Sequence, residues 1–247
     1  MVDGAVLTVT IDRSEVRNAV DPETARALEA AFRDFDARDE LAVAVLTGGG
    51  GNFCAGFDLK ALAGGARYAV GETGAGPMGP TRMVLRKPVI AAIEGYAVAG
   101  GLELALWCDL RVASRDATLG VFNRRFGVPL IDLGTVRMPR LIGQGRALDL
   151  ILTGRPVKAE EALRIGLVER VVEVGGALAE AQKLAREIAT FPQAALRGDR
   201  WSVLNQWSLD LDEARLAEYR EGVAAMRSGQ ALEGAKRFAE GSGRHGA

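Results

Sequence analysis

Two glycine-bearing turns, each following a strand-like apolar run, constrain the fold of this chain more than any other feature. Residues 52–59 (NFCAGFDL) follow the run 42–47, and residues 97–104 (AVAGGLEL) follow the run 89–93. Small residues at such positions let the backbone come close to another group. Two main-chain N–H groups that converge there on one carbonyl oxygen form an oxyanion hole, which stabilises negative charge as it develops. The sequence therefore predicts a site at these turns, with Glu103 three residues after Gly100 beside it.

The charge balance argues against several classes of partner. The 247 residues carry 31 Lys and Arg against 32 Asp and Glu, a formal net charge of -1, so no bulk field favours nucleic acid or an anionic membrane. No apolar run approaches the ~20 residues that span a bilayer, and the first residues lack the basic-then-apolar pattern of a signal peptide. We therefore expect a soluble, cytoplasmic protein that binds neither nucleic acid nor membrane.

Cysteine and histidine content narrows the chemistry. Cys54 and Cys108 lie inside apolar segments, which suits buried thiols in a reducing compartment better than a disulfide. The single histidine, His245, lies in a Gly/Arg-rich tail, which argues against serine–histidine triads and His-ligated zinc. Proton transfer would then use carboxylates, tyrosine, lysine or water. We expect no metal site and no redox cofactor.

The hydrophobic pattern predicts an α/β core followed by a helical region. The expected strands are 6–11, 42–46, 88–93, 109–113 and 168–172. The expected helices of the core are 22–38, 100–106, 135–141, 145–152 and one from 159 that Gly166 ends. After Gly176 nearly every residue to Phe238 fits a helix, with breaks at Phe191-Pro192, at Gly198 and near Gly229. We place the core at residues 1–190 and the helical C-terminal region at residues 191–247.

Residues 64–80 interrupt this pattern. They hold six glycines and two prolines and offer little that could anchor a core. Long structureless loops in compact domains often act as lids or binding loops. We expect a long mobile loop here.

Short motifs along the chain occur in a recognisable order. The main ones are 52–60 (NFCAGFDLK), 87–92 (KPVIAA), 99–104 (AGGLEL) and Cys108-Asp109, supported by Arg17-Asn18-Ala19, Leu152-Thr153-Gly154, 159–162 (AEEA) and Gly166-Leu167-Val168. Each is weak alone: the glycine pair also suits close helix–strand packing, and Glu103 also suits a favourable charge at a helix N-terminus. As an ordered set across almost the whole chain, they resemble the enoyl-CoA hydratase/isomerase (crotonase) superfamily.

The resemblance implies a fold, a ligand and an assembly. It implies a spiral of ββα turns with a helical C-terminal trimerisation region, a homotrimer or a hexamer built as a dimer of trimers, and acyl-CoA substrates. Coenzyme A would enter only as part of the substrate. The oxyanion donors would be the N–H groups of Phe57 and Gly100. Substrate and CoA contacts would come from Arg17, Ala55, Gly56, Asp58, Leu59 and Lys236 or Arg237. The loop 64–80 would roof the acyl pocket, and Phe238 would help to close it.

The acid/base positions depart from the family pattern. Glu103 falls on the family's first catalytic glutamate, whereas the second falls on Asn123 in residues 121–126 (VFNRRF). An amide can neither give nor take a proton, and loss of a general acid or base costs about 10²–10⁴-fold in rate, so ordinary fast two-glutamate hydration is not expected. Asp132 is either a substitute carboxylate or the N-cap of the following helix, and both alternatives stay open. The candidate catalytic residues are Glu103, Asp132 and Asn123.

Three functions remain open on this basis. The first is an enoyl-CoA hydratase/isomerase-like enzyme that stabilises a thioester enolate, with Glu103 as acid and base. The second is a hydrolase of CoA thioesters or β-diketones in which Glu103 and Asp132 activate water. The third is a non-catalytic CoA-binding protein, for which Asn123 is the motivating residue.

Overall fold

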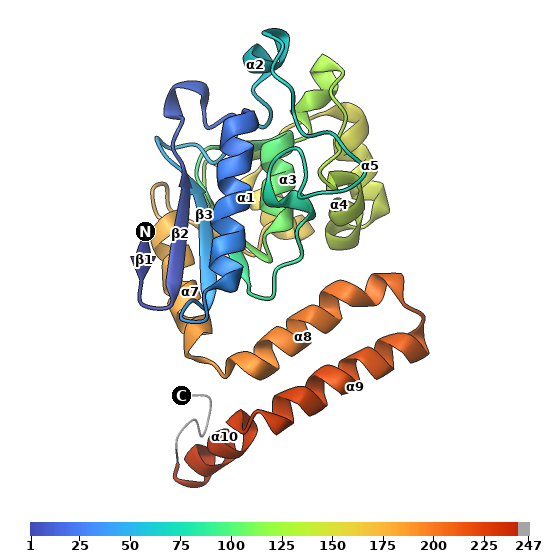
Figure 1. Cartoon of the computed structure of the whole chain (residues 1–247). Helices are drawn as coiled ribbons and strands as arrows, with labels where there is room; N and C mark the ends of the chain where they lie inside the picture. Colours follow the sequence, from blue (N-terminus) through green and yellow to red (C-terminus); the bar gives the residue numbers. More distant parts are fainter. Residues whose placement is uncertain (242–247) are drawn as a thin grey trace.

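Runs of apolar and β-branched residues form a six-stranded sheet at the centre of the core in the computed structural model, which describes residues 1–241 (Figure 1). The strand order is β1-β2-β3-β4-β6-β9, with β1 antiparallel to β2 and the remaining neighbours parallel. The strands are β1 (Val2–Asp3), β2 (Val6–Ile11), β3 (Val43–Gly48), β4 (Val89–Ile93), β6 (Leu110–Ser114) and β9 (Arg170–Val172). Every residue of β4 is buried, as expected for a parallel strand covered on both faces.

A smaller second sheet receives alternate strands of the chain. It has the order β5-β7-β8, and its members are β5 (Tyr96–Val98), β7 (Thr118–Gly120) and β8 (Val157–Lys158). The chain passes from β4 to β5, then from β6 to β7, and returns from β8 to β9. Two consecutive strands thus enter different sheets before the next helix, which is the ββα spiral that the resemblance implies.

Helices cover both faces of the larger sheet. Those of the core are α1 (Pro22–Ala37), α2 (Leu59–Ala63), α3 (Gly100–Trp107), α4 (Gly134–Ile142), α5 (Gln144–Thr153), α6 (Ala159–Ile165) and α7 (Ala177–Thr190). Helix α1 starts where its cap predicts, since the side chain of Asp21 accepts from Thr24 N at 2.8 Å and Pro22 follows. Phe32 packs in the same apolar cluster as Leu46, whereas Val45 belongs to the cluster that α7 covers. Alternate residues of β3 therefore serve two cores.

The C-terminal helices extend beside the core as a separate layer (Figure 1). They are α8 (Gln193–Asn205), α9 (Leu211–Arg227) and α10 (Gln230–Ala239). The prediction of a helix break at Gly198 is wrong, because α8 continues through that residue. A Cβ on Gly198 would lie 3.3 Å from Cβ of Glu221, so the glycine permits close packing of α8 on α9. The break lies instead before Asp210, which forms a capping box with Glu213. The expected break near Gly229 is confirmed.

Residues 64–80 are better anchored than the sequence suggests. They contain no α-helix or β-strand, and only the last of them enters the 3₁₀ helix η2 (Pro80–Arg82), but Met78 is fully buried in the core. The hydroxyl of Tyr68 donates to the carbonyls of Val20 at 2.9 Å and Asp58 at 3.2 Å. The expectation that little anchors this segment is therefore wrong.

Two further expectations from the sequence concern membrane-spanning helices and the position of His245. None of the helices within residues 1–241 is both long and apolar enough to cross a membrane. His245 lies outside the described residues, so its expected place in a tail is not addressed by the structure.

The packing of α3 yields a test of the fold. A Cβ on Gly101 would overlap the main-chain carbonyl of Cys54, which cannot move without disturbing its bridge to Ala97. We expect Gly101→Ala to lower the free energy of unfolding by about 1–3 kcal/mol, the usual cost of overpacking. The exposed Gly145, near the start of α5, has open space where a Cβ would lie. Gly145→Ala should leave stability unchanged or slightly raised; equal denaturant midpoints for both variants would contradict the packing.

Candidate active site

The N-terminus of α3 is built on a strained turn. Ala99 precedes the helix with φ 54° and ψ −125°, a conformation that costs energy in a residue with a side chain. Its own N–H donates to Gly120 O at 2.9 Å, and its carbonyl accepts from Glu103 N. Gly100 is the first residue of the helix, and none of the described residues accepts a hydrogen bond from its N–H. The turn therefore leaves one main-chain donor free at the positive end of a buried helix.

A second free donor lies at Phe57. Val20 N donates to Gly56 O at 2.8 Å and Asp58 N donates to Val20 O at 3.0 Å. These two bonds bracket Phe57, whose N–H has no acceptor among the described residues. Gly56 has φ 93°, and a Cβ on it would lie 2.8 Å from Gly100 N. The glycine thus permits the close approach of the two turns that the oxyanion hypothesis requires.

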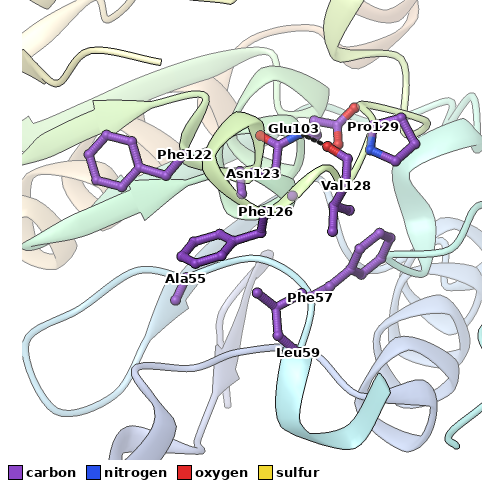
Figure 2. A pocket seen from close by; sticks show the side chains of 11 residues that line it. Ala55, Phe57, Leu59, Glu103, Phe122, Asn123, Phe126, Val128 and Pro129 are labelled. Atoms are coloured by element: carbon purple, nitrogen blue, oxygen red, sulfur yellow. Dashed lines mark hydrogen bonds between the residues drawn. The ribbon is translucent and has the colours of Figure 1, made fainter. Parts of the chain in front are cut away.

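Both turns open into one cavity (Figure 2). Apolar side chains dominate its wall, and the polar side chains that line it within the described part of the chain are those of Glu103 and Asn123. The lining residues are Ala55, Phe57, Leu59, Ala99, Gly100, Glu103, Phe122, Asn123, Phe126, Val128 and Pro129. None of residues 64–80 is among them, so the expected roof is wrong for the single chain. Met78 instead lies behind Gly100, where a Cβ would come within 2.8 Å of its sulfur.

Glu103 presents a buried carboxyl group to this cavity. Its Oε1 accepts from Asp132 N and from Gly134 N, both at 2.9 Å. The backbone of Leu133, between these two donors, is in the left-handed region. A Cβ on Gly134 would lie 2.8 Å from Oε1 of Glu103, so the close approach of the loop requires glycine at position 134. Burial first, and the nearby charge of Asp132 second, raise the pKa of Glu103 to about 8, against the lowering effect of the two N–H donors.

Asp132 lies behind Glu103 rather than in the wall of the cavity. It is fully buried, and its Oδ1 accepts from Met78 N at 3.0 Å and from the hydroxyl of Thr81. The alternative that it caps α4 is wrong, because Leu133 occupies the N-cap position and no side chain caps the helix. Burial raises the pKa of Asp132. The structure therefore joins the two acidic residues through a backbone N–H, while only Glu103 lines the cavity.

Asn123 is held tightly in the wall of the same cavity. It belongs to the short 3₁₀ helix η3 (Phe122–Phe126) and is 6% exposed. Its Nδ2 donates to Val128 O at 2.7 Å, and its own carbonyl accepts from the N–H groups of Gly127 and Val128. Its Oδ1 is buried and has no partner among the described residues. The residue that the resemblance places at the family's second glutamate is thus a rigid, neutral side chain in this structure.

The predicted CoA contacts divide into two groups. Ala55 and Leu59 line the cavity, and Gly56 makes the turn beside it. Asp58 caps α2, accepting from Lys60 N and Ala61 N, and pairs with the guanidinium of Arg13 at 3.0 Å, so it supports the loop. Arg17 is exposed and lies 5.3 Å from the ring centroid of Tyr96. Lys236 is on α10, and no residue of α8 to α10 lines the cavity; a ligand role for it stays a prediction.

Sequence reasoning missed the apolar wall and the supports of the Phe57 turn. Phe122, Phe126, Val128 and Pro129 line the cavity, although no motif or period distinguishes them in the sequence. Tyr68 packs on Phe57 with ring centroids 4.7 Å apart. Asn18 is fully buried, and its side-chain amide donates to Gly49 O and Asn52 O. Its presence in the family-like motif Arg17-Asn18-Ala19 is the signal in the sequence that could have indicated this supporting role.

Comparison with known proteins identifies the family of the chain. The family model for enoyl-CoA hydratase/isomerase matches residues 2–244. A carnitinyl-CoA dehydratase of Salmonella enteritidis is 36% identical over 245 residues, covering 96% of this chain and 93% of its own length. Solved structures of enoyl-CoA hydratases from Mycobacterium marinum and Mycobacterium tuberculosis each superpose with a TM-score of 0.92 at 38% identity, over 97% of this chain and 94% of theirs. These full-length matches confirm the resemblance: the chain belongs to the enoyl-CoA hydratase/isomerase, or crotonase, family.

Proposed function

We propose that this protein adds water to the double bond of an enoyl-CoA thioester, or removes it in reverse, with Glu103 as the single proton-transferring side chain. The observation that carries the proposal is the position of one buried carboxyl group in a cavity bordered also by two main-chain N–H groups that have no acceptor within residues 1–241. In this proposal coenzyme A is part of the substrate, and a homotrimer or hexamer in the cytoplasm is the expected form.

The two free N–H groups would polarise the thioester carbonyl by hydrogen bonding to its oxygen. The thioester carbonyl oxygen would lie between Phe57 N–H and Gly100 N–H, at the positive end of α3. Donors placed before the reaction stabilise the enolate oxygen as its charge grows, without reorganisation, and removing one donor of such a site typically costs about 10²–10³-fold. The hydride, metal or radical chemistry of a cofactor has no step in this scheme.

Glu103 moves one proton in two steps. The ionised carboxylate takes a proton from water as the water oxygen bonds to Cβ, and the π electrons move onto the thioester oxygen. The protonated carboxyl group then returns that proton to Cα as the enolate collapses. Oε1 is held by Asp132 N and Gly134 N, whereas none of the described residues donates to Oε2, so Oε2 is the oxygen free to exchange the proton. Dehydration reverses these steps.

The other candidate functions receive less support from the geometry. Hydrolysis of a thioester or β-diketone by paired carboxylates needs Asp132 at the water, but Asp132 does not line the cavity. Free thiol among the products would favour thioester hydrolysis, and turnover of a diketone without CoA would favour carbon–carbon cleavage. A non-catalytic role predicts binding of acyl-CoA with no turnover at any chain length.

Replacement of the carboxyl group tests the central role. Glu103→Gln should lower kcat for crotonyl-CoA hydration at least ~10²-fold, because an amide cannot carry the proton. The amide oxygen of Gln can still accept from Asp132 N and Gly134 N, so we expect binding of acyl-CoA to persist in calorimetric titration. Unchanged turnover would remove Glu103 from the mechanism.

The pH dependence follows from the direction of the same pKa. Because Glu103 must start ionised and its pKa is raised to about 8, kcat/KM should rise about tenfold per pH unit below that value and level off above it. Asp132→Asn removes a negative charge that contributes to the increase, so its profile should shift to lower pH. A profile that is flat from pH 6 to 9 would contradict a base of this kind.

A carboxylate at position 123 tests whether the missing glutamate limits hydration. Asn123→Glu should raise the rate of crotonyl-CoA hydration, since a second group can then take a proton. The matched control is Asn123→Gln, which has the same length but cannot ionise and should show no gain. Both variants lose the bond from Nδ2 to Val128 O, so any difference between them reports the ionisable group. Equal rates would show that the cavity differs from a two-glutamate site more deeply.

A further inference from the structure

Tyr68 holds an otherwise exposed stretch of chain against the core. Within residues 67–74 it is the only residue that is not exposed. Two side chains supply the hydrogen bonds that tie this stretch to the rest of residues 1–241. They are the hydroxyl of Tyr68 and the guanidinium of Arg82, which donates to Gly71 O. Because none of residues 64–80 lines the cavity, the contacts of Tyr68 are the place to look for the role of this segment.

The contacts of Tyr68 surround the turn that carries the Phe57 N–H. Its hydroxyl donates to Val20 O at 2.9 Å and to Asp58 O at 3.2 Å, which makes a three-centre hydrogen bond. Its ring packs on the ring of Phe57, with centroids 4.7 Å apart. Val20 O also accepts from Asp58 N at 3.0 Å, so both lone pairs of this carbonyl are used. One side chain therefore contacts Phe57, the residue after it and the residue bridged to it.

Val20 sets the direction of the Phe57 N–H through a single peptide group. Val20 N donates to Gly56 O at 2.8 Å, and Gly56 O belongs to the same peptide unit as Phe57 N. In a trans peptide the C=O and N–H bonds lie in one plane and point in opposite directions. The bond to Gly56 O therefore directs the Phe57 N–H away from Val20. A shift of Val20 would tilt this plane and misalign the donor beside the cavity.

The hydroxyl of Tyr68 stays a donor wherever the site is active. Burial first, and the nearby charge of Asp58 second, raise the pKa of Tyr68 to about 12. The pKa of Glu103 is raised only to about 8, so the phenol remains protonated over the whole range in which Glu103 titrates. The contact is thus a fixed part of the turn at every pH at which hydration would be measured.

We propose that Tyr68 is a positioning residue that holds the Phe57 N–H in line with the thioester oxygen, so that residues 64–80 support the oxyanion hole instead of roofing the cavity. The inference rests on the proposed function for the role of that N–H. Tyr68 touches no reacting atom in this scheme, because it does not line the cavity. Loss of its hydroxyl should therefore weaken polarisation of the thioester and leave Glu103 in place.

Removal of one hydroxyl group tests the inference by kinetics. Tyr68→Phe keeps a ring against Phe57 but cannot donate to Val20 O, so kcat for crotonyl-CoA hydration should fall about 3- to 10-fold, the range of one hydrogen bond. The midpoint of the pH profile should stay unchanged, because no charge near Glu103 is altered. The matched control is Tyr219→Phe, which loses a hydroxyl from α9, away from the lining of the cavity, and should keep the wild-type kcat.

The carbonyl stretch of a bound thioester reports the polarisation directly. Hydrogen bonds to a carbonyl oxygen weaken its double bond and lower the stretching frequency. Butyryl-CoA has no double bond to hydrate, so it can be labelled with ¹³C at the thioester carbonyl and followed by infrared spectroscopy. Binding to wild-type protein and to Tyr219→Phe should lower the frequency equally, Tyr68→Phe should give a smaller shift, and Tyr68→Leu, which also removes the ring, a smaller one still. Melting curves verify that each variant is folded, and a purely structural role would not move this frequency.

The outcomes separate the inference from the proposed function. Equal kcat and equal carbonyl frequency in wild-type and Tyr68→Phe protein would overturn the inference and leave the proposed function intact. A lower kcat with the wild-type frequency would assign the loss to something other than the oxyanion hole, and would also overturn the inference. If wild-type protein bound butyryl-CoA without any shift of the carbonyl frequency, no hydrogen bond would reach the thioester oxygen, and the proposed function itself would fail.

Discussion

The close approach of two backbone turns is the constraint on which the rest of the site depends. Gly56 lies so near the start of α3 that a Cβ on it would come within 2.8 Å of Gly100 N and 2.9 Å of Cβ of Ala99. Parallel strands bring the two turns to the same end of the core, and a strained residue, Ala99, directs the chain into the helix. Strain of this kind persists only where surrounding structure enforces it. Here the buried α3 and the bridge between Cys54 and Ala97 do so.

Burial of α3 then determines the chemistry of Glu103. All eight residues of the helix are buried, so its fourth residue, Glu103, reaches the cavity from a position shielded from water. Low polarity favours the neutral carboxyl group, while N–H groups from the loop before α4 favour the charged one. The balance leaves a carboxyl group that can both take and return a proton near neutral pH, which is the property a single acid/base residue requires.

The sequence predicts the elements that follow local rules and misses those set by distant packing. Helix α1 is predictable from Asp21 and Pro22, and the two turns are predictable because glycines mark them. Gly198 misleads because its role is to admit Glu221 of another helix, which no local pattern reveals. The acyl wall around Phe126 has no periodic signal, since η3 is too short to have one. The role of Asp132 cannot be decided from the sequence, because it depends on the backbone conformation of the next residue. Leu133 adopts a left-handed conformation and itself occupies the N-cap position of α4, so Asp132 does not cap the helix.

The placement of charge around Glu103 is consistent with a cavity that holds one ionisable group. A second carboxylate in the wall would raise the pKa of the first still further, as like charges do. In this chain the second acid, Asp132, is instead turned toward Thr81 and Met78, and the nearby guanidinium of Arg137 donates to Asp132 O and Thr81 O. Burial lowers the pKa of Arg137 to about 10, so it stays cationic and offsets part of the negative charge behind the cavity. Asn123 contributes polarity to the wall of the cavity without contributing charge. Glu103 can therefore titrate alone against the substrate, with its pKa set by groups that the substrate does not touch.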